Sequence, residues 1–283
     1  MKNNIKFNEW LVGFTEYNGS FNININNNKI IYNYKIIQKI NNKQLIYKIK
    51  DELKVGEIII KNNIIIYKLN DISKIIDVIL PIYDKYPLLS NNYNNYIKFK
   101  ECILISNDIT LNNNNKLLKI NNIINKDISN NQSPIWNNIK YNEIKSINDI
   151  KDKISKSWLT GLIETEGSFY IKRESYSNIS EYGKYKHYFG ISLKSDPIIL
   201  YSIKYLFHIK SNIKFYNNYY ILETSNYRSL NNIIKYFILN NNNNIFNSNK
   251  SFEFTLWKRT LLNNKDKYDK LYKIQQIIRL NKI

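Results

Sequence analysis

A segment of fourteen residues occurs twice in this chain, at positions 148 residues apart. The first copy, WLVGFTEYNGSFNI, begins at Trp10, and the second copy, WLTGLIETEGSFYI, begins at Trp158. Eight of the fourteen positions are identical in the two copies. Because the offset is close to the length of a typical domain, about 150 residues, the repeat predicts a chain of two related halves.

The same order of secondary structure follows each copy. The alternation in FNININ (21–26) predicts a half-buried strand, because successive side chains of a strand point to opposite faces. In the rest of the first half, the patterns predict a strand over 29–40, a hairpin over 57–69, and helices over 43–56, over 71–86 and after Pro87. In the second half, they predict a strand over 187–195, a hairpin over 212–225, and helices over 196–207, 227–239, 251–262 and 269–280. The expected fold class is α+β, with two pseudo-symmetric αββαββα halves and antiparallel sheets. We expect the halves over 1–105 and 151–283, with an Asn-rich linker over 106–150.

Each repeated segment predicts a short helix that is apolar nearly all round and is therefore buried on several sides. Gly13 and Gly161 lie within these helices, where Gly costs about 1 kcal/mol relative to Ala. Close approach of another backbone is the usual compensation, so we expect the two helices to pack on each other. Gly19 and Gly167 are expected to end the helices as the glycine that follows a C-cap.

One difference between the copies changes a charge: Asn18 in the first copy corresponds to Glu166 in the second. Glu166 is expected at the C-terminal end of a helix, where the helix dipole disfavours a carboxylate. A bound divalent cation would reverse this preference. The alternative is a solvated carboxylate at a frayed helix end.

The net charge of +19 points to a polyanionic partner such as nucleic acid. Residues 1–150 contribute +7 and residues 151–283 contribute +12, so both halves are basic. Biased base composition is the alternative explanation, because the chain has no Ala and has 50 Asn and 38 Lys but only 4 Arg. AT-rich coding of this kind is common in organelle genomes, and we therefore expect a mitochondrial protein encoded in the organelle, although an AT-rich nuclear genome remains an alternative. The first residues lack the features of a signal peptide or an Arg-rich presequence, and no apolar run is long enough to cross a membrane.

The paired segments resemble the two signature helices of the LAGLIDADG homing endonuclease and maturase family, in its single-chain form. The matching stretches are LVGFTEYNG and LTGLIETEG, each followed by Ser-Phe and a predicted strand, and DKYPLLSNNYNNYIKFK also resembles the family's first half. The resemblance implies a pseudo-twofold monomer in which the two helices pack together and saddle-shaped sheets grip a nucleic-acid duplex.

The resemblance also implies a metal centre in each half. The acid before the second Gly of each motif would bind Mg²⁺ or Mn²⁺ at a scissile phosphate, and this position is Glu166 in one half and Asn18 in the other. Asn offers only a neutral carbonyl oxygen, whereas Mg²⁺ is usually held by carboxylates and waters. The family's lysine near the start of a later helix maps to Lys250 and, in a loose alignment, to Asn91. Two catalytic groups are therefore absent from the first half, and whether Glu16 or Glu164 assists the metal stays open.

Polar side chains on the predicted strands are candidates for contacts with nucleic acid. Asn22, Asn24 and Asn26 share one face of a strand, and Asn side chains can pair bidentately with adenine in an AT-rich site. The other candidates are Lys35, Lys172, Arg173, Lys194 and Lys214. For each of them, a solvated strand face is the alternative.

Three functions remain open from the sequence. The first is an intron-encoded endonuclease that cuts or nicks a long AT-rich double-stranded DNA site. The second is a maturase that binds its own group I intron RNA and assists splicing without cleavage. The third is a relic that binds nucleic acid with no present role. The resemblance favours the first, with cleavage impaired or restricted to one strand by Asn18.

Overall fold

The structure is a computed structural model that describes residues 2–27, 29–127, 132–136, 139–175, 183–239 and 245–280. Its contacts divide the chain into two compact units. The first unit comprises Met1–Asn138 and Ser155–Leu162, and the second comprises Ile139–Ile154 and Ile163–Ile283. The boundaries predicted at residues 105 and 150 stay a prediction.

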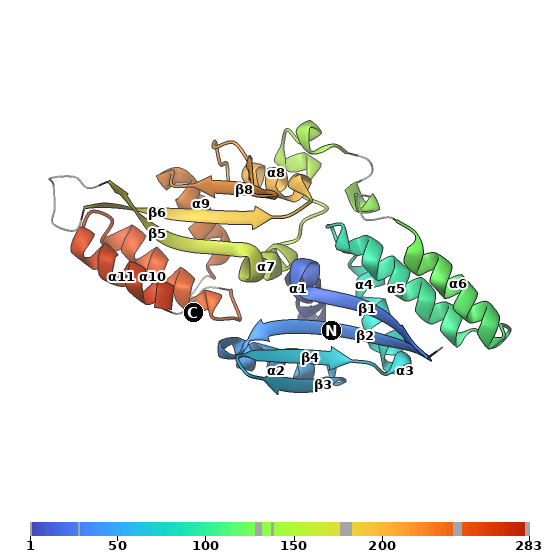
Figure 1. Ribbon diagram of the computed structural model, residues 1–283. Coiled ribbons are helices and arrows are strands. Elements are labelled where there is room, and N and C mark those ends of the chain that lie inside the picture. The colour runs from blue at the N-terminus through green and yellow to red at the C-terminus, as the bar shows by residue number, and fades with distance from the viewer. Residues whose placement is uncertain are drawn as a thin grey trace. The chain divides into compact units, whose positions relative to one another are not determined.

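The first unit contains one antiparallel sheet of four strands, in the order β1-β2-β4-β3 (Figure 1). Its elements are α1 (Lys2–Asn18), β1 (Gly19–Asn26), β2 (Lys29–Lys39), α2 (Lys43–Leu53), β3 (Glu57–Lys61), β4 (Ile64–Leu69), α3 (Ile72–Lys74), a π-helical segment (Ile75–Ile79), α4 (Leu80–Lys85), α5 (Asn92–Asn107) and α6 (Asn113–Asn125). Helix α6 lies in the stretch predicted to be a linker, and it packs beside α5 (Figure 1).

The second unit repeats this topology, with strand order β5-β6-β8-β7. Its elements are the end of α7 (Lys156–Glu166), then β5 (Gly167–Ser175), β6 (Lys184–Leu193), α8 (Pro197–Leu206), β7 (Lys214–Tyr216), β8 (Tyr219–Thr224), α9 (Tyr227–Phe237), α10 (Lys250–Asn263) and α11 (Tyr268–Leu280). The predicted fold class, two related α+β halves with antiparallel sheets, is confirmed. Among the described residues, no helix combines the length and the apolar character needed to cross a membrane.

An aromatic cluster forms the core of each unit on one side of its sheet. In the first unit, the Phe21 ring contacts the rings of Tyr34, Tyr83, Tyr96 and Phe99. In the second unit, the corresponding Phe169 ring contacts Phe189, Phe246, Phe254 and Trp257. The strand that follows each repeated helix is therefore anchored by its Phe, and the alternate side chains of that strand face away from the core.

The backbones of α1 and of the segment Ser155–Leu162, which belong to the same unit, approach closely at the two helical glycines. A Cβ atom added to Gly13 would overlap the backbone of Trp158. One added to Gly161 would overlap the backbones of Trp10 and Phe14. The absence of a side chain at both glycines therefore permits the packing of one repeated helix on the other.

The expectation for Gly19 and Gly167 was wrong in one respect. A glycine after a C-cap usually has positive φ, but in the described part of the chain the glycines with positive φ are Gly56 and Gly183. The chain instead passes directly from helix to strand at both positions. A Cβ on Gly19 would overlap Thr15, and one on Gly167 would overlap Ile163. These glycines are required by close contact with the preceding helical turn.

Candidate functional site

The first sheet has a polar face opposite its core, which we call the first open face. Asn22, Asn24 and Asn26 lie on it, and the last two are exposed. Lys35 lies on the same face, beside Lys68 in the strand register and half-buried. The structure thus brings the four predicted residues of this unit onto one face.

The second sheet has a corresponding open face that carries aromatic and charged side chains. Lys172 pairs in register with Lys186, and its ammonium lies 5.7 Å from the centre of the Tyr188 ring. The Lys186 ammonium forms an ion pair with Glu174 at 2.6 Å. This face therefore carries lysine side chains, and the acidic side chain of Glu174 among them already has a partner.

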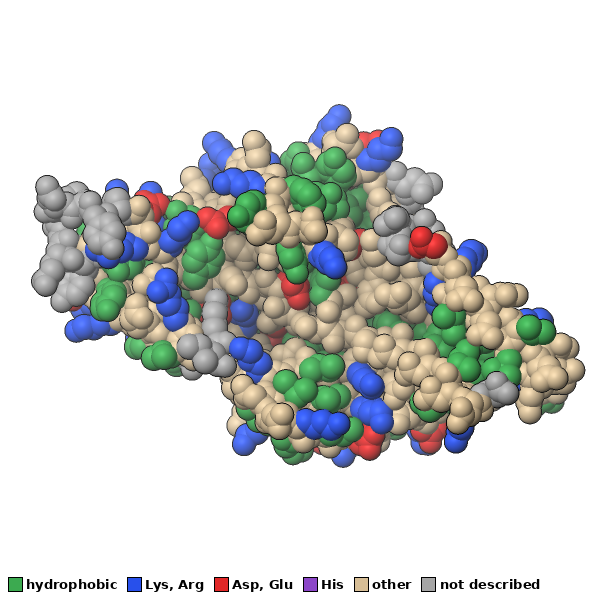
Figure 2. Space-filling model, in the orientation of Figure 1, with side chains coloured by type: hydrophobic (Ala, Val, Ile, Leu, Met, Phe, Trp, Pro, Cys, Tyr) green, Lys and Arg blue, Asp and Glu red, His purple; other side chains and the backbone are tan. Residues whose placement is uncertain are grey.

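The remaining predicted residues of the second unit do not all lie on the open face. Adjacent residues of a strand point to opposite faces, so Arg173 cannot share the face of Lys172. Lys194 follows the end of β6, and Lys214 is exposed on β7. Figure 2 shows that Lys and Arg side chains are spread over the visible surface rather than gathered in one patch.

Asn18 and Glu166 are the last residues of α1 and α7, and a strand begins at the next residue in each case. Both side chains are partly exposed, and neither makes a hydrogen bond to another residue in the part of the chain that the structure describes. Burial raises the pKa of Glu166 to about 7, while the nearby Lys250 ammonium acts to lower it. The negative end of the helix dipole and a carboxylate at the same place can attract a cation.

The acids two residues earlier have a different environment. The Glu16 carboxylate accepts hydrogen bonds from the backbone N–H groups of Leu89 and Ser90, at 2.7 and 3.1 Å. The Glu164 carboxylate accepts hydrogen bonds from the backbone N–H groups of Asn247 and Ser248, at 2.7 and 3.0 Å.

Both carboxylates are buried, and each binds the segment that leads into the next long helix. Their oxygens are occupied by backbone donors, so we assign Glu16 and Glu164 to positioning the helix ends rather than to holding a metal.

These hydrogen bonds also define which residues correspond in the two units. Ser90 and Ser248 occupy equivalent positions, because each accepts a hydrogen bond on its Oγ from the backbone N–H two residues later. Those two donors are Asn92 and Lys250, so Asn92 corresponds to Lys250. The loose alignment to Asn91 was therefore wrong by one residue.

Lys250 lies beside the end of α7. Its Nζ donates a hydrogen bond to the carbonyl oxygen of Gly167 at 2.6 Å. The amide of Asn92 makes a longer contact of 3.5 Å to the equivalent carbonyl of Gly19. Each side chain reaches the first residue of the strand that follows a repeated helix, so the correspondence holds in space as well as in sequence.

A third pair of residues follows the same correspondence. Glu253 is buried, and its Oε1 accepts the backbone N–H of Phe169 at 2.6 Å. The equivalent residue is Asn95, which is exposed and donates from its amide to Asn92 at 3.0 Å. We call Glu166, Lys250 and Glu253 the second helix-end centre, and Asn18, Asn92 and Asn95 the first helix-end centre. All three charged residues of the second centre are Asn in the first.

Sequence reasoning missed Glu253 and Asn95. Their signal was present, since Tyr96-Ile97-Lys98-Phe99 and Phe254-Thr255-Leu256-Trp257 place aromatic core residues at the same spacing after them. The described residues contain no cluster of three or more His, Cys, Asp or Glu that could hold a metal ion. A cation at the second centre would therefore depend on Glu166, phosphate oxygens and water, a ligand set that suits Mg²⁺. The neutral first centre fits a divalent cation poorly.

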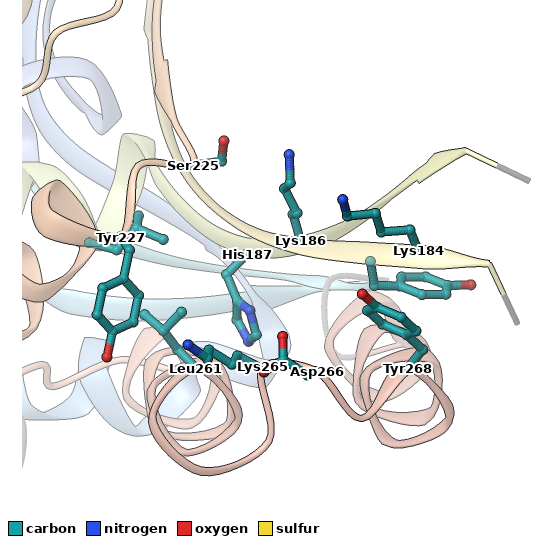
Figure 3. A pocket seen from close by; sticks show the side chains of 11 residues that line it. Lys184, Lys186, His187, Ser225, Tyr227, Leu261, Lys265, Asp266 and Tyr268 are labelled. Atoms are coloured by element: carbon teal, nitrogen blue, oxygen red, sulfur yellow. The ribbon is translucent and has the colours of Figure 1, made fainter. Parts of the chain in front are cut away.

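A cavity of about 170 Å³ lies in the second unit on the side of β6 opposite its open face (Figure 3). Figure 3 shows the His187 ring pointing toward the helices, whereas the Lys184 and Lys186 side chains point to the other side of the strand. His187 is buried and bonded to the Thr260 hydroxyl at 2.8 Å, and burial lowers its pKa to about 4. This histidine is therefore neutral at physiological pH and belongs to the core.

Comparison with known proteins begins with a family model. The model described as LAGLIDADG endonuclease matches this chain twice, over residues 11–103 and 159–261. The two matches contain the two repeated helices and extend to α5 and α10. They therefore cover more than half of the chain.

Two related proteins from yeasts are named as probable intron-encoded endonucleases. A probable intron-encoded endonuclease of Schizosaccharomyces pombe, Cox1-I1b, is 32% identical over 96% of this chain and 68% of its own length. A probable intron-encoded endonuclease of Kluyveromyces lactis, aI3, is 28% identical over 88% of this chain and 63% of its own length. The chain thus spans about two-thirds of the length of these relatives.

Solved structures share the fold at low sequence identity. The meganuclease I-CpaMI bound to uncleaved DNA has a TM-score of 0.73 and 22% identity, with 96% of both chains covered. I-SmaMI, bound to an uncleaved DNA target in the presence of calcium ions, has a TM-score of 0.76 and 18% identity, again with 96% of both chains covered.

Proposed function

Because the chain belongs to the LAGLIDADG endonuclease family, we propose that it is an intron-encoded homing endonuclease that nicks one strand of its DNA site. The observation that carries the restriction to one strand is the difference between the two helix-end centres. The second centre has a carboxylate at Glu166 and an ammonium at Lys250, whereas the first has Asn18 and Asn92.

DNA binding is assigned to the two open faces. Structural neighbours with the same fold are bound to DNA, and the net charge of +19 suits a phosphate backbone. On the first open face, Asn24 and Asn26 are exposed and can read adenines in the major groove. On the second, Lys172 can contact phosphates. A long AT-rich double-stranded site is the expected target, and a monomer with two related halves suffices to cover it.

The chemistry is assigned to the second helix-end centre. Glu166 would hold Mg²⁺ or Mn²⁺ together with oxygens of the bound phosphate. When bound, the cation neutralises charge on the scissile phosphate and makes a coordinated water more acidic. Lys250 adds a positive charge beside this position, because its ammonium donates to the carbonyl of Gly167, the residue after Glu166.

A maturase is the second candidate, and the first helix-end centre favours it. A protein that only binds and stabilises a folded group I intron needs no metal-binding acid, so loss of charge at Asn18, Asn92 and Asn95 would have no cost. The names of the two yeast relatives associate them with introns. A further relative, from Saccharomyces cerevisiae and 31% identical over 59% of this chain, is described as a mitochondrial protein. A mitochondrial location is proposed for this chain on that basis and on its composition.

One experiment separates the candidates. Purified protein is incubated with a supercoiled plasmid that carries the intronless insertion site, in Mg²⁺ and then in Mn²⁺, and separately with the intron RNA. We expect conversion to the open circle without linear product, and its loss in Glu166→Gln. Linear product from the wild type would contradict restriction to one strand. Splicing assistance that survives Glu166→Gln, with no nicking by the wild type, would replace the nuclease with the maturase.

A further inference from the structure

The second helix-end centre contains a buried carboxylate that the proposed chemistry does not use. We propose that Glu253 is a positioning residue that holds the Lys250 ammonium away from Glu166, so that Glu166 stays available to a cation. This inference rests on the proposed function for its effect on the reaction rate, but the position of the ammonium can be measured without activity.

Lys250 and Glu253 lie three residues apart in the first turn of α10. The Lys250 Nζ is 3.2 and 3.4 Å from the two carboxylate oxygens of Glu253, and it also donates to the Gly167 carbonyl. Both side chains are nearly inaccessible to solvent, with exposed fractions of 11% and 9%. Charges that are shielded from water in this way interact more strongly than a surface pair.

The pair binds the outer edge of β5. This strand is at the edge of its sheet, so the carbonyl of Gly167 and the N–H of Phe169 have no neighbouring strand on that side. Lys250 occupies the carbonyl, and Glu253 accepts the N–H at 2.6 Å. The bond from the Phe169 N–H holds Glu253 in place, and the Glu253 carboxylate in turn holds the Lys250 ammonium beside the Gly167 carbonyl.

The first unit provides an internal comparison. At the equivalent strand edge, the Asn92 amide contacts the Gly19 carbonyl at 3.5 Å, and Asn95 is bonded to Asn92 at 3.0 Å. A neutral polar pair is therefore compatible with this strand edge, and the edge alone does not require a buried ion pair. The charged pair occurs in the unit where the helix ends in Glu166. We infer that its purpose is electrostatic control of that centre.

The flexible side chain of Lys250 allows its ammonium to take more than one position. Lys is a compact charge on four rotatable carbons, and Glu166 is close enough for Lys250 to lower its pKa. Without the charge of Glu253, the ammonium would turn toward Glu166 and form a direct ion pair. That pair would compete with a divalent cation and remove the positive charge from its fixed place.

The test compares Glu253→Gln with the wild type. Gln keeps an acceptor for the Phe169 N–H but loses the negative charge. We expect the nicking rate at saturating DNA to fall at least tenfold, while the Kd for target DNA in Ca²⁺ changes less than threefold. Glu253→Asp, which keeps the charge, should recover part of the rate. Lys100→Gln serves as the control, because it breaks the exposed Lys100–Asp84 ion pair in the other unit, keeps the hydrogen bond from the Tyr96 hydroxyl to Asp84, and should leave the rate unchanged.

A second measurement follows the ammonium directly, by NMR of protein labelled with ¹⁵N at lysine Nζ. The Lys250 signal is identified by its absence in Lys250→Arg, and we expect it to shift or broaden in Glu253→Gln. An unchanged signal overturns the inference even if the wild type proves inactive, in which case the proposed function fails separately. A slower rate that is accompanied by a lower Tm and a weaker affinity for DNA, and is explained by them, would also overturn the inference. Glu253 would then have a structural role alone.

Discussion

The indole N–H of Trp158 donates a hydrogen bond to the Glu16 carboxylate at 2.9 Å, and this bond joins the two copies of the repeated segment. Glu16 is almost completely buried, with an exposed fraction of 1%. It also accepts two backbone N–H groups, from Leu89 and Ser90. One carboxylate therefore connects α1, the helix that packs on it and the segment that leads into α5.

The first prediction concerns stability against pH. Burial raises the pKa of Glu16 from 4.5 to about 7, although hydrogen bonds from Ser90, Leu89 and Trp158 act to lower it. Between these two pKa values the folded state binds more protons than the unfolded state. The contribution of Glu16 to the unfolding free energy therefore falls as pH rises from 4.5 to 7, by at most about 1.4 kcal/mol per pH unit.

This contribution is measured as a difference between proteins. Burial lowers the pKa of His187 to about 4, so the contribution of His187 to the unfolding free energy rises with pH over much of the same range. The pH dependence of wild-type stability alone therefore does not isolate the contribution of Glu16. Urea unfolding of the wild type and of Glu16→Gln at pH 5, 6 and 7 provides the comparison. We expect the stability of the wild type relative to the variant to decrease with pH. A constant difference would show that Glu16 is ionised throughout.

The second prediction concerns the pH dependence of nicking. Burial raises the pKa of Glu166 to about 7, and a protonated carboxyl does not bind a cation. The apparent affinity for Mn²⁺ should therefore weaken as pH falls below 7, by up to about tenfold per pH unit well below the pKa, since each bound cation displaces one proton. Nicking rates as a function of Mn²⁺ concentration at pH 5.5, 6.5 and 7.5 measure this. A half-saturating concentration that does not change over this range would place the Glu166 pKa near its ordinary value.

Much of the two helix-end centres could be predicted from the sequence, and the exceptions have identifiable causes. The repeat placed Asn18 and Glu166 at helix ends, because motif and periodicity are local. Glycines at 13 and 161 predicted close backbone approach because nothing else explains Gly inside a buried helix. The residue of the first half that is equivalent to Lys250 was harder to identify. The offset between matching residues grows from 148 at the repeat to 158 at α5 and α10.

The sequence left the roles of Glu16 and Glu164 open between assisting a metal and capping or orienting a segment. Their partners are backbone N–H groups more than seventy residues away, and a backbone donor leaves no mark in the sequence. The sheet face on which a strand side chain lies can, by contrast, be predicted from local alternation. Alternation along FNININ placed the three Asn side chains on one face, whereas applying the same rule to adjacent Lys172 and Arg173 would have separated them.

The third prediction is a gain of function at the first helix-end centre. Replacing Asn18 by Glu and Asn92 by Lys gives this centre the two groups that the other centre has at Glu166 and Lys250. If absence of these groups is what restricts cleavage to one strand, the double variant should convert plasmid to linear product in Mg²⁺. Gel separation of open-circular and linear plasmid measures the outcome.

The control for this variant is the single change Asn92→Lys, which adds the ammonium without the acid. It should still yield only the open circle, because a cation at this centre needs an anionic ligand. Linear product from Asn92→Lys alone would mean that a lysine, rather than the acid, limits the first centre. No linear product from the folded double variant would mean that geometry as well as charge has been lost there.

The fourth prediction uses neighbouring residues that lie on opposite faces of β5. Lys172→Ala removes a cation from the second open face, so the Kd for DNA should rise and the slope of log Kd against log salt should fall by about 1. Arg173→Ala removes one charge from the other face and should leave that slope unchanged. Fluorescence anisotropy with labelled target DNA, in Ca²⁺ and from 50 to 200 mM salt (roughly the range over which phosphate contacts are resolved), measures both. Equal changes in slope for the two variants would contradict DNA binding by this face, because a general effect of net charge would then account for both.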